Sequence, residues 1–163
     1  MYEKEPAKSY RYNDPQDADF GKILDPRHTA LLMIDMQNDF CDKEGKFAQA
    51  GRDASDVIRI VPRCKELLES ARSANVMVVH IQQSTLPGQQ SDNGGWLAFK
   101  TRDGKAPTYA TVNTWGWEHI DALKPHNDGE DGRYFEPVVL KFRPDGFLYT
   151  QLDLILRANG IES

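Results

Sequence analysis

The sequence lacks the features that would place the protein on nucleic acid, in a membrane or in an oxidising compartment. Lysine and arginine number 20 against 25 acidic residues, which gives a net charge of −5, and no basic cluster interleaves with aromatic residues. No apolar run approaches the roughly 20 residues of a membrane-spanning helix, and the charged N-terminus has no secretory signal. Two cysteines, Cys41 and Cys64, make no disulfide framework. We therefore expect no nucleic-acid or membrane partner and a cytoplasmic location.

The length of 163 residues suits one domain with a hydrophobic core. Residues 1–25 are polar with scattered aromatic side chains, and we interpret them as an N-terminal arm. The arm either lies on the domain or a neighbouring subunit, or is a frayed tail. A turn at Asp25-Pro26 leads into a domain that we assign to residues 26–163.

An uninterrupted apolar run, Ala30–Ile34, ends directly in Asp35. Such a run is typical of a strand buried on both faces, as in a parallel sheet. Ligands of open α/β sheets bind at the carboxyl ends of the strands, so Asp35 lies where chemistry is expected. Its apolar surroundings should disfavour the charged form. The alternative is an N-cap or turn aspartate.

Further elements complete a β-α-β pattern. Apolar residues recur at helical spacing over residues 57–71, in a helix that starts near Pro62 or kinks there, and Asn75 is a plausible left-handed stop. Strands follow at 76–81 and 138–142, and a last helix runs from Thr150, its N-cap, to Gly160. Residues 161–163 resemble the entry to a fourth strand. The pattern predicts a three-layer α/β/α, Rossmann-like fold with a central parallel sheet that is incomplete in this chain.

Residues 82–136 form a long segment without periodicity, which we interpret as a variable insertion with one short helix at 118–123. It holds all three tryptophans, and these could roof a pocket or fill a subunit contact. Residues 41–46 are predicted to form a polar loop. His80 lies inside an apolar strand, which favours a packing role over metal binding or acid–base work.

Lys141 lies near the carboxyl end of the third predicted strand, as Asp35 does at the end of the first. If these strands are neighbours, the two side chains can meet, and each buried charge needs a partner. The pair is a plausible half of an active site, although it lacks a nucleophile. A purely structural ion pair is the other interpretation.

Two stretches carry a family resemblance: TALLMIDMQNDFCDKEG at 29–45 and VVLKFRPDGFLYTQLDLILRANGIES at 138–163. They resemble the signatures of the isochorismatase-like hydrolases, the cysteine hydrolase superfamily. The resemblance implies an Asp–Lys–Cys triad in which Asp35 and Lys141 match the first two members. The resemblance also implies that the family cysteine follows the next strand, beyond Ser163, and neither Cys41 nor Cys64 matches its motif. We therefore expect residues 1–163 alone to be inactive and not independently stable.

The resemblance also implies a substrate class and a mechanism. The sequence looks closest to hydrolases of small ureido compounds and N-carbamoyl amides, such as ureidoacrylate, biuret and triuret hydrolases. No Asp-x-His zinc pattern follows the second strand, so we expect no metal and no cofactor. We expect a small-molecule substrate and a homo-oligomer, either a dimer or a tetramer. The alternatives are an isochorismatase-type vinyl ether hydrolase without the cysteine and a catalytically silent assembly domain. Candidate pocket residues are Gln37, Asn38, Phe40, Phe147 and Tyr149.

Overall fold

The structure, a computed structural model, describes residues 20–102, 104, 108–126 and 135–162. Most of the predicted N-terminal arm, residues 1–19, lies outside these ranges, as does the polar end of the insertion, residues 127–134. The last residues of the predicted arm form a short helix, α1 (Phe20–Ile23), before the chain enters the sheet.

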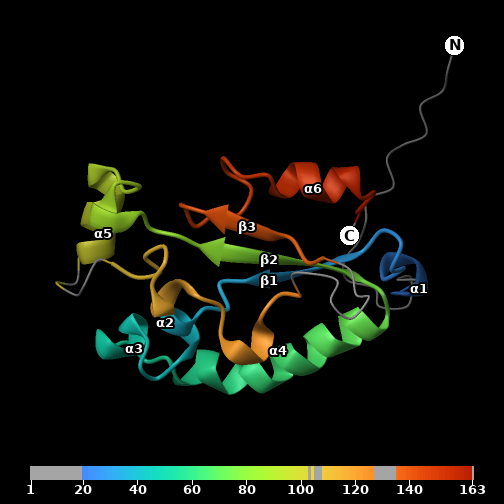
Figure 1. The fold of residues 1–163 in the computed structure, drawn as a ribbon, viewed down its shortest axis with the longest axis horizontal. Coiled ribbons are helices and arrows are strands. Elements are labelled where there is room, and N and C mark those ends of the chain that lie inside the picture. The colour runs from blue at the N-terminus through green and yellow to red at the C-terminus, as the bar shows by residue number, and fades with distance from the viewer. Residues whose placement is uncertain (1–19, 103, 105–107, 127–134, 163) are drawn as a thin grey trace, which may run out of the picture.

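Three parallel strands form the sheet in the order β1-β2-β3 (Figure 1). They are β1 (Ala30–Ile34), β2 (Met77–Gln83) and β3 (Val138–Lys141). The predicted parallel sheet is confirmed, and β2 is the central strand of the part described. The prediction for β2 ended two residues too early, because its last residues are polar. The extra length pairs Gln83 with Lys141 in the register of β2 and β3.

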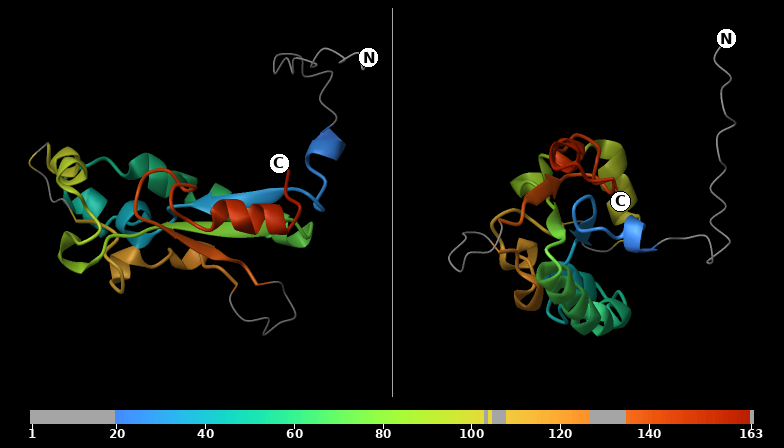
Figure 2. Two further views of the ribbon diagram at one scale, coloured as in Figure 1. Left: turned by 90° about the horizontal axis from the view of Figure 1, so that it is seen from above. Right: turned by 90° about the vertical axis from the view of Figure 1, so that its right-hand side faces the viewer.

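Helices cover both faces of the sheet and give three layers (Figures 1 and 2). The long helix α4 (Ser55–Ser73) lies on one face and α6 (Leu152–Ala158) on the other. Helix α4 begins well ahead of Pro62, which lies inside it. Asn75 has φ 55° and ends the helical segment in the predicted left-handed conformation. No helix within the described ranges is both long and apolar enough to cross a membrane.

Apolar side chains form one cluster on each side of the sheet. Leu68 and Ala71 of α4 pack against Met33 and Val78, and partly buried Cys64 joins this cluster. Leu152 of α6 packs against the opposite face of β2 and β3. The Thr150 hydroxyl accepts a hydrogen bond from the Leu152 amide at 3.2 Å, so it caps the start of α6 from one residue outside the assigned N-cap.

The predicted irregular insertion contains a helix that the sequence interpretation missed, α5 (Gly94–Thr101). Asn93 caps it by accepting a hydrogen bond from the Trp96 amide at 2.8 Å. Two glycines open the helix, and glycine's low helix propensity hides it from a pattern search. In Figure 1, α5 lies beyond the arrowheads of the strands, at the carboxyl edge of the sheet.

Short elements complete the carboxyl edge. The predicted polar loop at 41–46 is present at residues 42–45, between two single-turn helices, α2 (Asn38–Cys41) and α3 (Lys46–Gln49). The insertion adds three 3₁₀ turns, which are η1 (Pro87–Gln89), η2 (Trp115–Trp117) and η3 (Asp121–Leu123). The predicted helix at 118–123 is therefore only the turn η3. Backbone hydrogen bonds from Asn38 to Glu118 and from Ile120 to Met36 tie the insertion to the segment after β1.

Candidate active site

Asp35 and Lys141 meet at the carboxyl edge of the sheet as predicted, but β1 and β3 are not neighbours as that prediction assumed, because β2 lies between them. They follow or end the two strands that flank β2, and Lys141 Nζ lies 2.8 Å from Asp35 Oδ2. Asp35 has φ 57°, so the chain turns sharply as it leaves β1. The Asp35 amide still donates to Ile81 O at 2.8 Å, which anchors this turn to the central strand.

The ammonium of Lys141 is almost fully enclosed, with 3% of its side chain exposed. A buried ammonium needs acceptors for its N–H groups, and three oxygens supply them. Besides Asp35 Oδ2, these are Gln83 Oε1 at 3.1 Å and Pro144 O at 3.4 Å. The sequence interpretation missed Gln83, although its position beside Lys141 follows once β2 is extended.

The two oxygens of the Asp35 carboxyl group have different surroundings, and burial acts on its pKa. Burial raises its pKa above the ordinary value, although Lys141 and the nearby Gln83 amide act in the opposite direction. Oδ2 is held by Lys141, whereas Oδ1 is buried without a hydrogen-bond partner in the part of the chain that the structure describes. About a third of the side chain is exposed, at 33%. One oxygen is thus anchored by Lys141, whereas the other is buried and has no hydrogen-bond partner among the described residues.

Two of the predicted pocket residues are buried in backbone contacts. Gln37 is fully buried, and its Nε2 donates to Gln83 O at 2.9 Å and to Trp117 O at 2.8 Å. Its Oε1 accepts from the Gln83 amide at 2.9 Å. Asn38 Nδ2 donates to Trp115 O at 2.8 Å. Both side chains fasten the insertion beside Asp35, and their contact with substrate stays a prediction.

The other predicted pocket residues lie at the same edge. Phe40 packs edge-on against Tyr109, with ring centroids 5.3 Å apart. Phe147 and Tyr149 are exposed, and Tyr149 lines a cavity of about 300 Å³ together with Phe142 and Arg143. Phe142 and Arg143 directly follow Lys141, so this cavity adjoins the end of β3. Substrate binding by these residues also remains a prediction.

Cys41 is poorly suited to act as the nucleophile. It is buried, and its Sγ lies 3.9 Å from the carbonyl oxygen of Asp35, not from the carboxylate. Burial raises the pKa of the Cys41 thiol to about 11, so the thiol stays protonated near neutral pH. The only other cysteine, Cys64, packs on α4 in the core.

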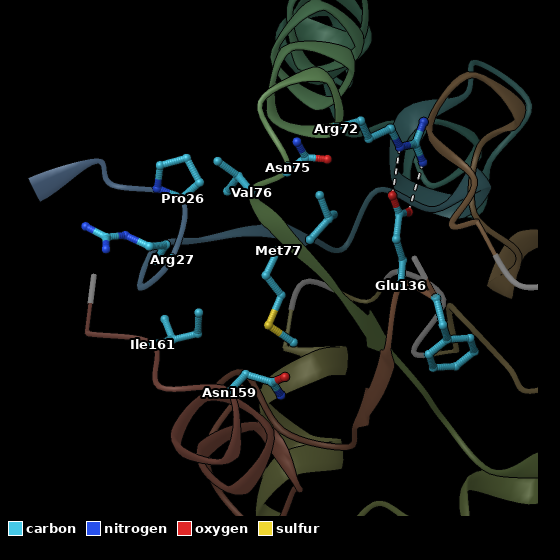
Figure 3. Close-up of a pocket in the computed structure, with 11 residues that line it drawn as sticks. Pro26, Arg27, Arg72, Asn75, Val76, Met77, Glu136, Asn159 and Ile161 are labelled. Carbon is cyan, nitrogen blue, oxygen red and sulfur yellow. Dashed lines mark hydrogen bonds and ion pairs between the residues drawn. The ribbon is translucent and has the colours of Figure 1, made fainter. Parts of the chain in front are cut away.

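A larger cavity, of about 380 Å³, lies at the opposite edge of the sheet (Figure 3). Residues before β1 and β3 and at the start of β2 line it, so it is at the amino ends of the strands. Arg72 and Glu136 form an ion pair there, with Arg72 Nε 2.7 Å from Glu136 Oε1. His80 is fully buried and binds Glu136 at 2.9 Å, in the packing role predicted for it. This cavity has no contact with Asp35 or Lys141.

The residues at the end of β2 and directly after it do not fit a zinc site. Gln83, Ser84 and Thr85 offer amide and hydroxyl groups in place of the acid and imidazole ligands that zinc prefers. Among the described residues, no three histidine, cysteine, aspartate or glutamate side chains gather closely enough to hold a metal ion.

Comparisons with known proteins agree with this fold and with the sequence motifs. A family model described as the isochorismatase domain matches residues 29–163. The ureidoacrylate amidohydrolase RutB of Caulobacter segnis is 32% identical over 148 residues, which cover 85% of this chain and 59% of that protein. The chain thus spans about three fifths of the length of that curated relative.

Solved structures give the same picture. A cysteine hydrolase from Pseudomonas syringae matches with TM-score 0.65 and 27% identity over 83% of this chain and 56% of the other. An isochorismatase-like hydrolase from Alkaliphilus metalliredigens matches with TM-score 0.62 and 29% identity, over 82% of this chain and 63% of the other.

Proposed function

The chain belongs to the isochorismatase family, and we propose that the complete protein is a cysteine-dependent amidohydrolase. Its substrate would be a small ureido compound or N-carbamoyl amide, from which it releases ammonia. The observation that carries the proposal is the contact of Asp35 with Lys141 at the carboxyl edge of a parallel sheet. The similarity to a ureidoacrylate amidohydrolase over most of this chain supports the substrate class.

In the proposed reaction, Asp35 is the proton carrier. Its free oxygen, Oδ1, takes the proton of a cysteine thiol contributed by the chain beyond Ser163. The thiolate attacks the substrate carbonyl, and a new C–S bond forms. As the C–N bond breaks, Asp35 returns the proton to the leaving nitrogen, which departs as ammonia. Water then attacks the resulting thiocarbamate, the C–S bond breaks, and the proton of the water passes through Asp35 to the departing sulfur.

Lys141 has a supporting electrostatic role in this scheme. Its positive charge opposes the effect of burial on Asp35, so that the carboxyl group remains a usable base. The same charge favours a nearby thiolate over the neutral thiol. Because Lys141 is itself enclosed and fully supplied with acceptors, it holds one position throughout the cycle.

The cavity beside β3 is the proposed substrate pocket. Arg143 donates from Nη1 to the carbonyl oxygens of Ser91 and Phe142, which fixes its guanidinium at the wall of this cavity. Tyr149 lies at the rim with 94% of its surface exposed. Together with Gln37, Asn38, Phe40 and Phe147, these residues make up the surroundings that we assign to substrate.

Substitution of Asp35 by asparagine tests the proposal. In the full-length protein, Asp35→Asn keeps the shape of the side chain but cannot accept the proton, so we expect kcat to fall by about 10²–10⁴-fold. The matched control is Asp153→Asn on the exposed face of α6, where the carboxylate binds only Arg157 at 2.8 Å, and here kcat should stay normal. Near-normal turnover by Asp35→Asn would exclude Asp35 as the proton carrier.

The substrate panel separates the proposal from its rivals. Ureidoacrylate and N-carbamoyl amides should release ammonia, and isochorismate should be inert. Hydrolysis of isochorismate alone would assign the protein to vinyl ether chemistry. Inertness towards the whole panel would favour the silent assembly domain.

A further inference from the structure

We infer that Gln83 is a positioning residue for the Asp35–Lys141 pair, and that it holds the lysine ammonium where it can serve the aspartate. This inference rests on the proposed function only insofar as the pair is catalytic. Gln83 does not touch the carboxylate of Asp35 through its side chain. It acts through Lys141, whose Nζ lies 3.1 Å from Gln83 Oε1.

The contacts of Lys141 show why Gln83 matters. An ammonium has three N–H donors and no acceptor. Two of the three oxygens around Nζ come from side chains, those of Asp35 and Gln83, and the third contact, to Pro144 O, is the longest at 3.4 Å. Without Gln83, the enclosed ammonium would keep only one short contact and would have to move toward other acceptors.

Gln83 is itself held firmly in place. The side chain of Gln37 bonds to both backbone groups of Gln83, accepting from its N–H at 2.9 Å and donating to its C=O at 2.9 Å. Gln83 also pairs with Lys141 in the register of β2 and β3. The chain of contacts therefore runs from Gln37 through Gln83 and Lys141 to Asp35, over two adjacent strands and the segment that follows β1.

The neutral amide of Gln83 can accept a hydrogen bond from the Lys141 ammonium without adding a negative charge beside Asp35. It offers the ammonium a dipole but no charge, so the full positive charge of Lys141 remains available to Asp35. A carboxylate at the same place would share the ammonium and repel the negative form of Asp35. Glutamine and glutamate side chains have the same length, so the substitution Gln83→Glu tests the effect of the added charge.

Among the residues that the structure describes, few titratable groups besides Lys141 interact with Asp35. Lys141 binds Asp35, and Cys41 of α2 and Tyr109 of the insertion interact electrostatically with the Asp35 carboxylate. Burial raises the pKa of both Cys41 and Tyr109, so both stay neutral while Asp35 titrates. A change in the titration of Asp35 can therefore be attributed to the lysine and its acceptors.

The experiment compares Gln83→Met, Gln83→Glu and Gln82→Met in the full-length protein. Methionine keeps the volume of glutamine and removes the acceptor. Gln82 is the matched control, because it is the adjacent glutamine, is 3% exposed and bonds to Trp117 O at 2.7 Å instead of to Lys141. The readouts are the pKa of the Asp35 carboxyl by ¹³C NMR, kcat, KM and thermal unfolding.

We expect Gln83→Met to raise the Asp35 pKa by about 0.5–1 unit, and Gln83→Glu to raise it by more than about 1 unit. In both variants kcat should fall by about tenfold or more, with KM changed by no more than about twofold. Gln82→Met should lower thermal stability but leave the Asp35 pKa and kcat unchanged. An Asp35 pKa that does not move in either Gln83 variant, or moves equally in Gln82→Met, overturns the inference.

The NMR readout keeps the two hypotheses apart. If the wild-type protein hydrolyses none of the proposed substrates but the Asp35 pKa responds to Gln83, the proposed function fails and the positioning of the pair by Gln83 stands. If hydrolysis is observed but the Asp35 pKa does not change in the Gln83 variants, the proposed function stands and the positioning role of Gln83 fails.

Discussion

Mild acid should destabilise the protein through one buried imidazole, that of His119. Only 7% of this residue is exposed, and its Nε2 is buried without a hydrogen-bond partner among the described residues. Its ring meets that of His80 edge to face, with centroids 5.3 Å apart. The pKa of His119 is lowered from 6.5 to about 4, chiefly by burial and to a smaller extent by the nearby His80 and Lys124. The folded protein therefore keeps His119 neutral.

The sign and size follow from proton linkage. Between pH 6.5 and about pH 4 the unfolded chain binds a proton at His119 and the folded protein does not, so acid favours unfolding. The contribution of neutral His119 to the free energy of unfolding is complete above pH 6.5 and is lost as the pH falls toward 4. Lowering the pH from 7.5 to 5.5 should remove about 1.3 kcal/mol, and the full shift corresponds to about 3.4 kcal/mol. The loss of about 1.3 kcal/mol depends mainly on the pKa of His119 in the unfolded chain, since at pH 5.5 the imidazole of the folded protein is still mostly neutral.

The assay is urea unfolding of the full-length protein at pH 7.5, 6.5 and 5.5, in the wild type and in His119→Phe. Phenylalanine keeps an aromatic ring against His80 and cannot take up a proton. The wild type should lose about 1.3 kcal/mol more than the variant between pH 7.5 and 5.5. His28→Gln removes an imidazole near the amino edge of the sheet and should leave the contribution of His119 in place. Parallel stability profiles for the wild type and His119→Phe would refute this account.

Two further predictions concern packing and metal. Gly116→Ala should destabilise the protein by about 2–4 kcal/mol in urea unfolding, because the new Cβ would overlap the Asp39 carboxylate, which accepts from the Ala110 amide at 2.7 Å. The control Gly94→Ala meets no atom within 4 Å and should change stability by less than about 1 kcal/mol, whereas an equal loss in both would refute the overlap. Dialysis of the full-length protein against a chelator should leave its hydrolase activity intact, and activity that is lost and then restored by zinc would reveal a metal site that the sequence did not.

The elements predicted correctly are those that the sequence marks by runs of apolar residues. Strands β1 and β3 read as unbroken apolar runs, although Ile34 and Leu140 are exposed, and the short β-α-β connection predicts that β1 and β2 are parallel. The prediction that Asp35 meets Lys141 rested on both strands ending at the same edge of the sheet. The pairing is thus a consequence of topology, which a single sequence can supply.

The missed features depend on contacts between distant segments. Strand β2 continues through Gln82 and Gln83, whose amides are satisfied by Trp117 O and Lys141, and no local pattern announces such partners. The helix α5 begins with two glycines, so its only local signal was the capping residue Asn93. In both places tertiary hydrogen bonds override the propensity of the residues themselves.

The left-handed backbone conformation of Asp35 was likewise not predicted from the sequence, and the site depends on it. A residue that simply continued β1 would have kept a negative φ and would have projected from one face of the sheet. Asp35 has φ 57°, a conformation that aspartate tolerates better than most residues, and the Gln37 amide donates to Asp35 O at 2.8 Å across the turn. The turn directs the carboxylate along the sheet edge toward Lys141 while the Asp35 amide remains bonded to Ile81 O. Aspartate at this position therefore meets two demands at once, a left-handed backbone and a charged partner for Lys141, and glycine or asparagine could meet only the first.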